Sequence, residues 1–116
     1  MLDTFRALAE PSRLQIFELL ANGPLPVGGV VERLGIRQPQ ASKHLHVLSE
    51  AGLVEVRPDA QRRIYAVRTE RLDEMDAWLR RYRRMLEEQF ERLDDVLAEM
   101  KAAGQSAQRK KKRAKR

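Results

Sequence analysis

A short helix bracketed by two glycines most constrains what this chain can fold into. Gly35 and Gly52 can adopt the left-handed backbone conformation that ends a helix, and Pro39 is tolerated only in the first turn of one. Between the glycines, apolar residues recur at i, i+4 and i+7 and make one narrow stripe: Ala41, Leu45 and Leu48. We therefore expect a helix at about residues 38–51 that buries one face and leaves the other free.

The free face of this helix carries amides, a hydroxyl, an imidazole and one ammonium group: Gln38, Gln40, Ser42, Lys43 and His46. Glutamine reads adenine through two hydrogen bonds, while serine and lysine bind phosphate or the acceptor atoms of guanine. This composition predicts that these five residues bind DNA. The alternative is the solvated surface of an ordinary helix.

The preceding segment favours DNA binding. Residues 27–34 form a helix that ends at Gly35, so two helices follow one another across a tight turn, the layout in which the second helix enters the major groove. Gly28 and Gly29 each cost about 1 kcal/mol relative to alanine inside a helix. We therefore expect the first helix of the pair to be short and frayed at its start.

The following segment predicts a β-hairpin. Residues 53–57 and 63–68 alternate apolar with polar side chains, and residues 58–61 join them. A hairpin beside such a helix is a wing, here at about residues 53–68. Its arginines can reach the DNA backbone or the minor groove: Arg57, Arg62 and Arg63. The alternative is a solvated hairpin whose arginines serve solubility.

Four stretches in this order resemble the ArsR family of winged-helix repressors: LAEPSRLQIFELL at residues 8–20, QPQASKHL at 38–45, AGLV at 51–54 and RRIY at 62–65. The resemblance covers about residues 3–80. It implies a mainly α fold with a small β-hairpin, a winged helix-turn-helix with a long C-terminal dimerisation helix. It also implies a cytoplasmic, homodimeric, sequence-specific transcriptional repressor that binds double-stranded DNA at an inverted repeat.

Three features depart from the family pattern. Arg37 stands where the family usually has a capping serine, and Ala60 stands at the wing tip where glycine is frequent. Metal-sensing relatives carry cysteines at the positions of Pro26, Gly28 and Val31, or histidines on the final helix, and this chain has neither. The resemblance is therefore to the branch without these metal ligands, and we expect no metal site, no cofactor and no response to metals.

Charge supports the placement of the DNA-binding surface. The formal net charge is +6, but residues 101–116 hold eight Lys and Arg and no acid, while residues 1–100 hold 15 Lys and Arg against 17 Asp and Glu. Within the folded part, positive charge is local: residues 33–71 hold eight Lys and Arg against four acids. This block contains the predicted helix and wing, where a nucleic-acid footprint is expected.

The last helix is predicted from about Glu70 to Ala102 and carries a heptad stripe. A helix this long cannot bury its whole stripe on so small a domain, so we predict a homodimer. The residues assigned to dimerisation are Leu72, Leu79, Tyr82, Leu86, Phe90, Leu93 and Leu97. The alternative is intramolecular packing onto the first two helices. The groove between the paired helices near Trp78, Tyr82 and Phe90 could also bind a small-molecule effector of unknown chemistry, as an alternative to ordinary dimer packing there.

Composition changes sharply after the last helix. We expect residues 1–102 to form one DNA-binding and dimerisation domain, followed at 103–116 by a disordered basic tail without large apolar residues. The tail either adds sequence-independent phosphate contacts or is a solvated end. If the tail supplies most of the affinity, the protein is a sequence-tolerant chromosome-associated protein. A winged-helix module that binds proteins alone is a second alternative.

The sequence shows no arrangement of residues that is typical of a catalytic site. The chain has no cysteine, which excludes disulfides and thiolate metal sites. His44 and His46 lie on nearly opposite helix faces and cannot share a metal, so we expect an inner-face hydrogen bond for His44. Arg13 is predicted on the surface or at a phosphate. With no phosphate-binding loop, no nucleophile–base pair, no signal-peptide layout and no run of ~20 apolar residues, we expect neither an enzyme nor a membrane protein.

Overall fold

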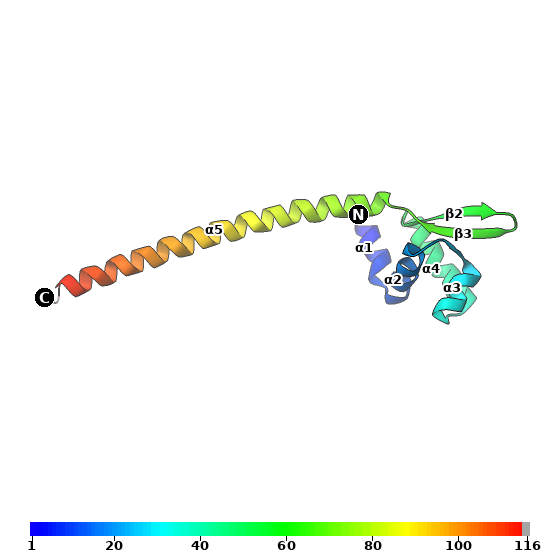
Figure 1. The fold of residues 1–116 in the computed structure, drawn as a ribbon, viewed down its shortest axis with the longest axis horizontal. Helices are drawn as coiled ribbons and strands as arrows, with labels where there is room; N and C mark the ends of the chain where they lie inside the picture. The colour runs from blue at the N-terminus through cyan, green and yellow to red at the C-terminus, as the bar shows by residue number, and fades with distance from the viewer. Residues whose placement is uncertain (115–116) are drawn as a thin grey trace. The chain divides into compact units, whose positions relative to one another are not determined.

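Five helices and three short strands make up the described part of the chain (Figure 1). The computed structural model describes the backbone of residues 1–114 and the side chains of residues 1–105. In chain order the elements are α1 (Leu2–Ala9), α2 (Pro11–Ala21), β1 (Leu25–Pro26), α3 (Val27–Leu34), α4 (Gln38–Glu50), β2 (Val54–Asp59), β3 (Arg62–Val67) and α5 (Glu70–Ala114). They form two units, Met1–Ala77 and the part of α5 from Trp78 onward.

The predicted fold class is confirmed. The first unit pairs α3 with α4 across a tight turn, follows them with the β2–β3 hairpin and enters the long helix α5. One buried cluster holds the unit together, and six of its side chains are almost fully enclosed: Ile16, Val30, Leu45, Leu48, Leu53 and Val54. These residues come from α2, α3, α4 and the start of the hairpin, so the helix-turn-helix and the wing share one core.

The junction between α1 and α2 depends on two charged side chains. Glu10 is the N-cap of α2, and its carboxylate accepts the backbone N–H of Arg13 at 2.8 Å. This hydrogen bond lowers the pKa of Glu10 below its ordinary value. Arg13 in turn donates from Nε to the carbonyl of Ala7 at 2.8 Å and from a terminal nitrogen to that of Arg6. Arg13 is half-buried rather than fully on the surface, because its guanidinium binds carbonyls at the end of α1.

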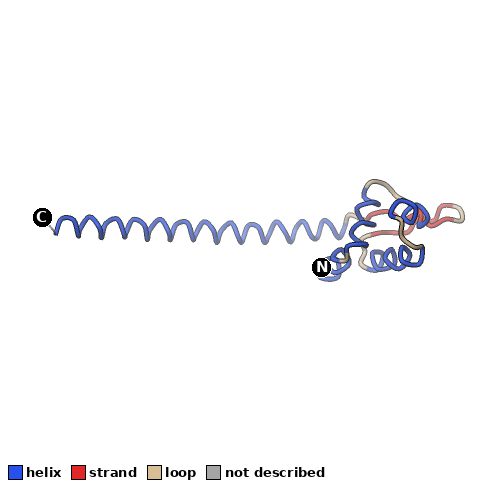
Figure 2. Tube along the Cα trace, turned by 90° about the horizontal axis from the view of Figure 1, so that it is seen from below, coloured by secondary structure: helices blue, strands red, loops and turns tan. Residues whose placement is uncertain are grey.

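The sheet has three antiparallel strands in the order β1-β3-β2. Strand β1 was not predicted, because two residues that include a proline carry no alternation; it pairs Leu25 with Tyr65. The hairpin turn is shorter than expected, since pairing continues to Asp59 and Arg62 and leaves only two turn residues (Figure 2). The first of them, Ala60, has φ 55°, the positive value that such a tight hairpin turn requires.

The two glycines of α3 differ in their surroundings. A Cβ at Gly29 would lie 3.3 Å from Cδ2 of Leu25, so a side chain there would press on β1. A Cβ built at Gly28 meets nothing within 4 Å. The helix nevertheless begins at Val27 as predicted, and Val30 is fully buried. A Cβ would therefore make a tight contact at position 29 and no contact at position 28.

Helix α5 continues beyond its predicted end. It was expected to stop near Ala102, with a disordered tail at 103–116, but it is helical as far as Ala114. Alanine, glutamine, lysine and arginine are among the strongest helix formers, and the single Gly104 costs only about 1 kcal/mol. The final two residues of the expected tail lie outside the described residues.

Glu10→Gln should change how the stability of the protein responds to acid. Because the folded-state pKa of Glu10 is lowered, the carboxylate stabilises the fold above about pH 4.5, and this stabilisation is lost as the pH falls below that value. We expect the wild type to melt at a higher temperature than the variant near neutral pH, and the two melting temperatures to converge in acid. Thermal unfolding followed by circular dichroism measures this difference. Glu18→Gln, at an exposed glutamate on the same helix, is the matched control, and a difference that stays constant with pH would contradict the assignment.

Candidate nucleic-acid interface

The ends of α4 are set by residues with special backbone properties. Gly35 closes α3 with φ 64° and donates its N–H to the carbonyl of Val31 at 2.9 Å. Pro39 lies in the first turn of α4, and Arg37 at the N-cap makes no side-chain capping bond. At the other end Gly52 has φ 76°, and a Cβ there would lie 3.0 Å from Nε of Arg71. Helix α3 ends at Leu34 and α4 begins at Gln38, so the connection between them is only three residues long, 35–37.

One face of α4 is completely enclosed, which fixes the rotation of the helix. Ala41, Leu45 and Leu48 are all 0% exposed. The five residues predicted to bind DNA are all exposed: Gln38, Gln40, Ser42, Lys43 and His46. Spacings of three and four residues place Gln38, Ser42 and His46 in one row with Lys43 beside it, while Gln40 lies on the opposite flank next to Lys43. Burial of the inner face thus presents a continuous polar surface to solvent.

The two histidines of α4 have different surroundings. His46 is 74% exposed, and its Nε2 lies 3.9 Å from a carboxylate oxygen of Glu50. The side chain of His44 is only 19% exposed, and its buried Nδ1 lies 3.8 Å from Oε2 of Glu10. That distance is too long for a hydrogen bond, and Nδ1 has no other hydrogen-bond partner among the described residues. The expected inner-face hydrogen bond of His44 is therefore wrong for Nδ1.

The three wing arginines are not equivalent. Arg57 donates to Oε1 of Glu55 at 2.9 Å from Nε and 2.6 Å from a terminal nitrogen, so its charge is compensated in the free protein. Arg62 and Arg63 open β3 directly after the turn. Both are exposed, and neither forms an ion pair within the described part of the chain. Lys43 on α4 is likewise exposed and unpaired there. Three uncompensated cations therefore lie on α4 and the wing.

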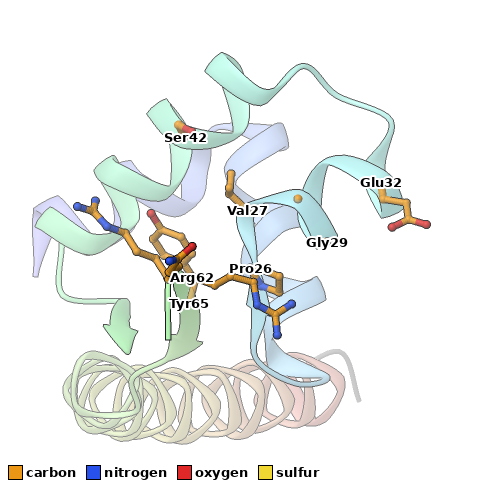
Figure 3. A pocket seen from close by; sticks show the side chains of 10 residues that line it. Pro26, Val27, Gly29, Glu32, Ser42, Arg62 and Tyr65 are labelled. Atoms are coloured by element: carbon orange, nitrogen blue, oxygen red, sulfur yellow. The ribbon is translucent and has the colours of Figure 1, made fainter. Parts of the chain in front are cut away.

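A groove of about 810 Å³ lies between the wing and the helix-turn-helix (Figure 3). Its lining combines α3, α4 and the hairpin: Pro26, Val27, Gly28, Gly29, Glu32, Ser42, Gln61, Arg62, Arg63 and Tyr65. Sequence reasoning had assigned Ser42, Arg62 and Arg63 to DNA contact but had missed Tyr65, whose phenol faces the groove. Strand alternation could have identified Tyr65, because residues two positions apart in a strand, such as Arg63 and Tyr65, lie on the same side of it. The groove lies between the polar surface of α4 and the part of the wing that includes the turn residue Gln61 and the start of β3.

The apolar stripe of α5 is exposed along most of its length. Six of the seven residues assigned to dimerisation are exposed, with Phe90 at 61%: Leu79, Tyr82, Leu86, Phe90, Leu93 and Leu97. Leu72 differs because it is half-buried and packs against the core of the first unit. The ring of Trp78 stacks on Tyr82 with centroids 5.0 Å apart. In the single chain, the apolar face of α5 from Leu79 onward is therefore exposed to solvent.

The described residues hold neither a metal-ligand cluster nor a membrane-spanning helix. No three side chains among His, Cys, Asp and Glu gather there in a group that could hold a metal ion. No helix of that part combines the length and apolarity needed to cross a membrane.

Known proteins share this architecture. The sequence pattern of a helix-turn-helix domain matches residues 8–57. The HTH-type transcriptional regulator Rv2034 of Mycobacterium tuberculosis is 46% identical over 61 residues, covering 53% of this chain and 57% of that protein. The transcriptional repressor SdpR of Bacillus subtilis is 29% identical over 79 residues, covering 68% of this chain and 88% of that protein. The chain spans about half the length of several curated relatives that it matches.

A solved structure of a transcriptional regulator also resembles this chain. It is the homodimeric winged helix-turn-helix DNA-binding domain of Mb0332 from Mycobacterium bovis, described as a possible ArsR-family transcriptional regulator. The two are 33% identical with a TM-score of 0.58, over 67% of this chain and 72% of that one. Together with the helix-turn-helix and the β-hairpin, these similarities show that the chain belongs to the ArsR family of winged helix-turn-helix transcriptional regulators.

Proposed function

We propose that this protein is a homodimeric repressor that reads an inverted-repeat operator with α4 of each copy and contacts the flanking backbone with its wing. The observation that carries the proposal is the contrast between the two faces of α4. The inner face is 0% exposed at three positions, while the outer face presents amides, hydroxyl and imidazole beside an unpaired lysine. Such groups match the hydrogen-bonding edges of bases, and Lys43, Arg62 and Arg63 match phosphates.

Repression and pairing are supported by relatives. SdpR is named a transcriptional repressor, and the Mb0332 domain is homodimeric. In a dimer, the two α4 helices would enter successive major grooves about one helical turn apart and read a palindromic site. The exposed stripe of α5 supports the same conclusion, because a contiguous apolar face of this size rarely stays in water on a monomer.

The charges of α5 favour one orientation of the pair. Residues 80–84 carry four arginines, Arg80, Arg81, Arg83 and Arg84, whereas residues 87–99 carry six acids and one arginine. In a parallel pair, the arginines of residues 80–84 would lie opposite the same arginines of the other copy, and the acids of residues 87–99 opposite the same acids. Both contacts would be repulsive. In an antiparallel pair, residues 80–84 of one copy can lie opposite residues 91–95 of the other. The same register places Leu79 opposite Val96 and Tyr82 opposite Leu93, so it satisfies both the apolar stripe and the charges.

The sequence and structure also support a regulator that does not respond to metals. The chain has no cysteine, and its two histidines lie on different faces of α4. Thiolate and imidazole ligands are the usual protein donors for zinc and similar metals. Adding zinc or nickel to a DNA-binding titration should leave the dissociation constant of this protein unchanged. A metal-dependent shift of tenfold or more would contradict this part of the proposal.

Specific DNA recognition can be tested with a duplex that the wild-type protein selects from a randomised library. Gln38→Ala and Gln40→Ala should each weaken binding to the selected duplex, since a bidentate base contact discriminates by ~1–3 kcal/mol. Binding to a random duplex of the same length should change little, so the specificity ratio falls roughly tenfold. Fluorescence anisotropy titrations measure both affinities, and Gln15→Ala, at an exposed glutamine on α2, is the matched control.

The same titrations distinguish the proposal from a chromosome-associated protein. Deleting residues 104–116 should weaken binding to both duplexes by a similar factor and leave the ratio intact. Loss of all binding on deletion, or equal affinity of the wild type for both duplexes, would instead support the sequence-tolerant alternative. If Lys43→Glu combined with Arg62→Glu left DNA affinity unchanged, the winged unit would not be a DNA reader at all.

Pairing through α5 can be tested by disulfide crosslinking, because the natural chain has no cysteine. Leu79→Cys and Val96→Cys should each fail to crosslink alone, since equivalent positions of an antiparallel pair lie about 25 Å apart. A refolded mixture of the two variants should form a crosslinked heterodimer in a glutathione redox buffer. Denaturing gels without reductant give the readout.

Two results would contradict this arrangement. Crosslinking of each variant with itself would show a parallel pair, and a lack of crosslinks in every sample from a protein that sediments as a monomer would exclude the homodimer.

A further inference from the structure

Gly28 has no explanation in the fold itself. A Cβ at its neighbour Gly29 would lie 3.3 Å from Cδ2 of Leu25, which is a tight contact, but a Cβ at position 28 meets nothing within 4 Å. The backbone at Gly28 also lies outside the left-handed region that favours glycine. Alanine would therefore fit the structure and would stabilise the helix. The space in front of Gly28 is free of protein atoms and opens into the groove between α3, α4 and the wing.

The groove has the chemistry to hold an anion. Arg62 and Arg63 line it without an ion-pair partner among the described residues, and the hydroxyls of Ser42 and Tyr65 line it from α4 and β3 (Figure 3). The planar guanidinium group of arginine matches the geometry of phosphate oxygens. Glu32 is the opposing charge in the lining, and it is exposed. Two unpaired cations against one carboxylate leave the groove positive.

The groove is continuous with the predicted DNA-reading surface. Ser42 belongs to both, since it lies in the outer row of α4 with Gln38 and His46 and also lines the groove. Arg62 and Arg63 begin the strand that follows the wing tip. A nucleic-acid strand whose bases face α4 would therefore meet the groove as it passes toward the wing.

We propose that this groove seats the sugar–phosphate backbone of one DNA strand, and that position 28 is glycine because the strand occupies the space a side chain would fill. Glycine is the residue that lets a ligand approach a protein backbone closely. The proposal rests on the DNA-binding function proposed above and adds Gly28 and Tyr65 to the residues that contact DNA. Glu32 opposes binding from the far wall of the groove.

Substitutions at Gly28 test the proposal directly. Gly28→Ala adds one methyl group to open space, and it should raise the melting temperature while reducing DNA affinity by less than about threefold. Gly28→Gln adds bulk without charge and should cost more affinity. Gly28→Glu adds bulk and a negative charge and should weaken binding to the library-selected duplex by at least tenfold, which is about 1.4 kcal/mol. Gln15→Glu, which adds the same charge to an exposed position on α2, should stay within twofold of the wild type.

Glu32→Gln supplies a test in the opposite direction. Removing this carboxylate should tighten binding two- to fivefold at low salt, and the gain should shrink as salt screens the charges. Tyr65→Phe, which removes only the hydroxyl, should weaken binding. Circular dichroism and thermal melting confirm that every variant is folded before its affinity is compared.

The groove assignment is overturned if folded Gly28→Glu binds the selected duplex as the wild type does, or loses no more affinity than Gln15→Glu. It is also overturned if Glu32→Gln fails to tighten binding. Neither result affects the proposed function, which depends on the wild-type preference for the selected duplex over a random one. If the wild type shows no such preference, the repressor assignment fails, whatever the Gly28 variants do.

Discussion

The complete burial of one face of α4 is the constraint on which the rest of the site depends. Ala41, Leu45 and Leu48 lie against a core built from α2, α3 and the start of the hairpin. Rotating α4 by even one residue would expose a leucine and bury either Ser42 and His46 or Gln40 without a partner, at a cost of several kcal/mol. The apolar core therefore determines which polar groups reach solvent.

The helices that the sequence located correctly are those whose ends carry glycine or proline, the residues with special backbone conformations. Gly35, Pro39 and Gly52 restrict where helices begin and end, so α3 and α4 were placed within one residue of the structure. The hairpin was found from alternation, although its turn proved two residues shorter. That error has a physical cause, because the positive φ needed at the tip is taken by Ala60, a residue type that rarely adopts it. Pattern alone could not identify the turn.

What sequence reasoning missed depends on contacts between distant residues. Arg13 looks like any exposed arginine until α1 brings the carbonyls of Arg6 and Ala7 within its reach. Nδ1 of His44 has no hydrogen-bond partner among the described residues, and a carboxylate oxygen of Glu10 lies 3.8 Å away. The end of α5 was placed too early because charge density was read as disorder, whereas helix propensity carries the backbone to Ala114. The groove is the clearest case, since no linear pattern unites Gly28 with Arg62 and Tyr65.

The alanine at the wing tip has a consequence for the thermodynamics of association. A two-residue turn with Ala60 at φ 55° has fewer accessible backbone states than one built from glycine, although it holds the alanine in a less favourable conformation. A tip that is already ordered gives up less conformational entropy when a polyanion settles against the neighbouring arginines. In the complex proposed above, an alanine tip has less backbone entropy to lose than a glycine tip, so part of the cost of ordering the wing is met during folding.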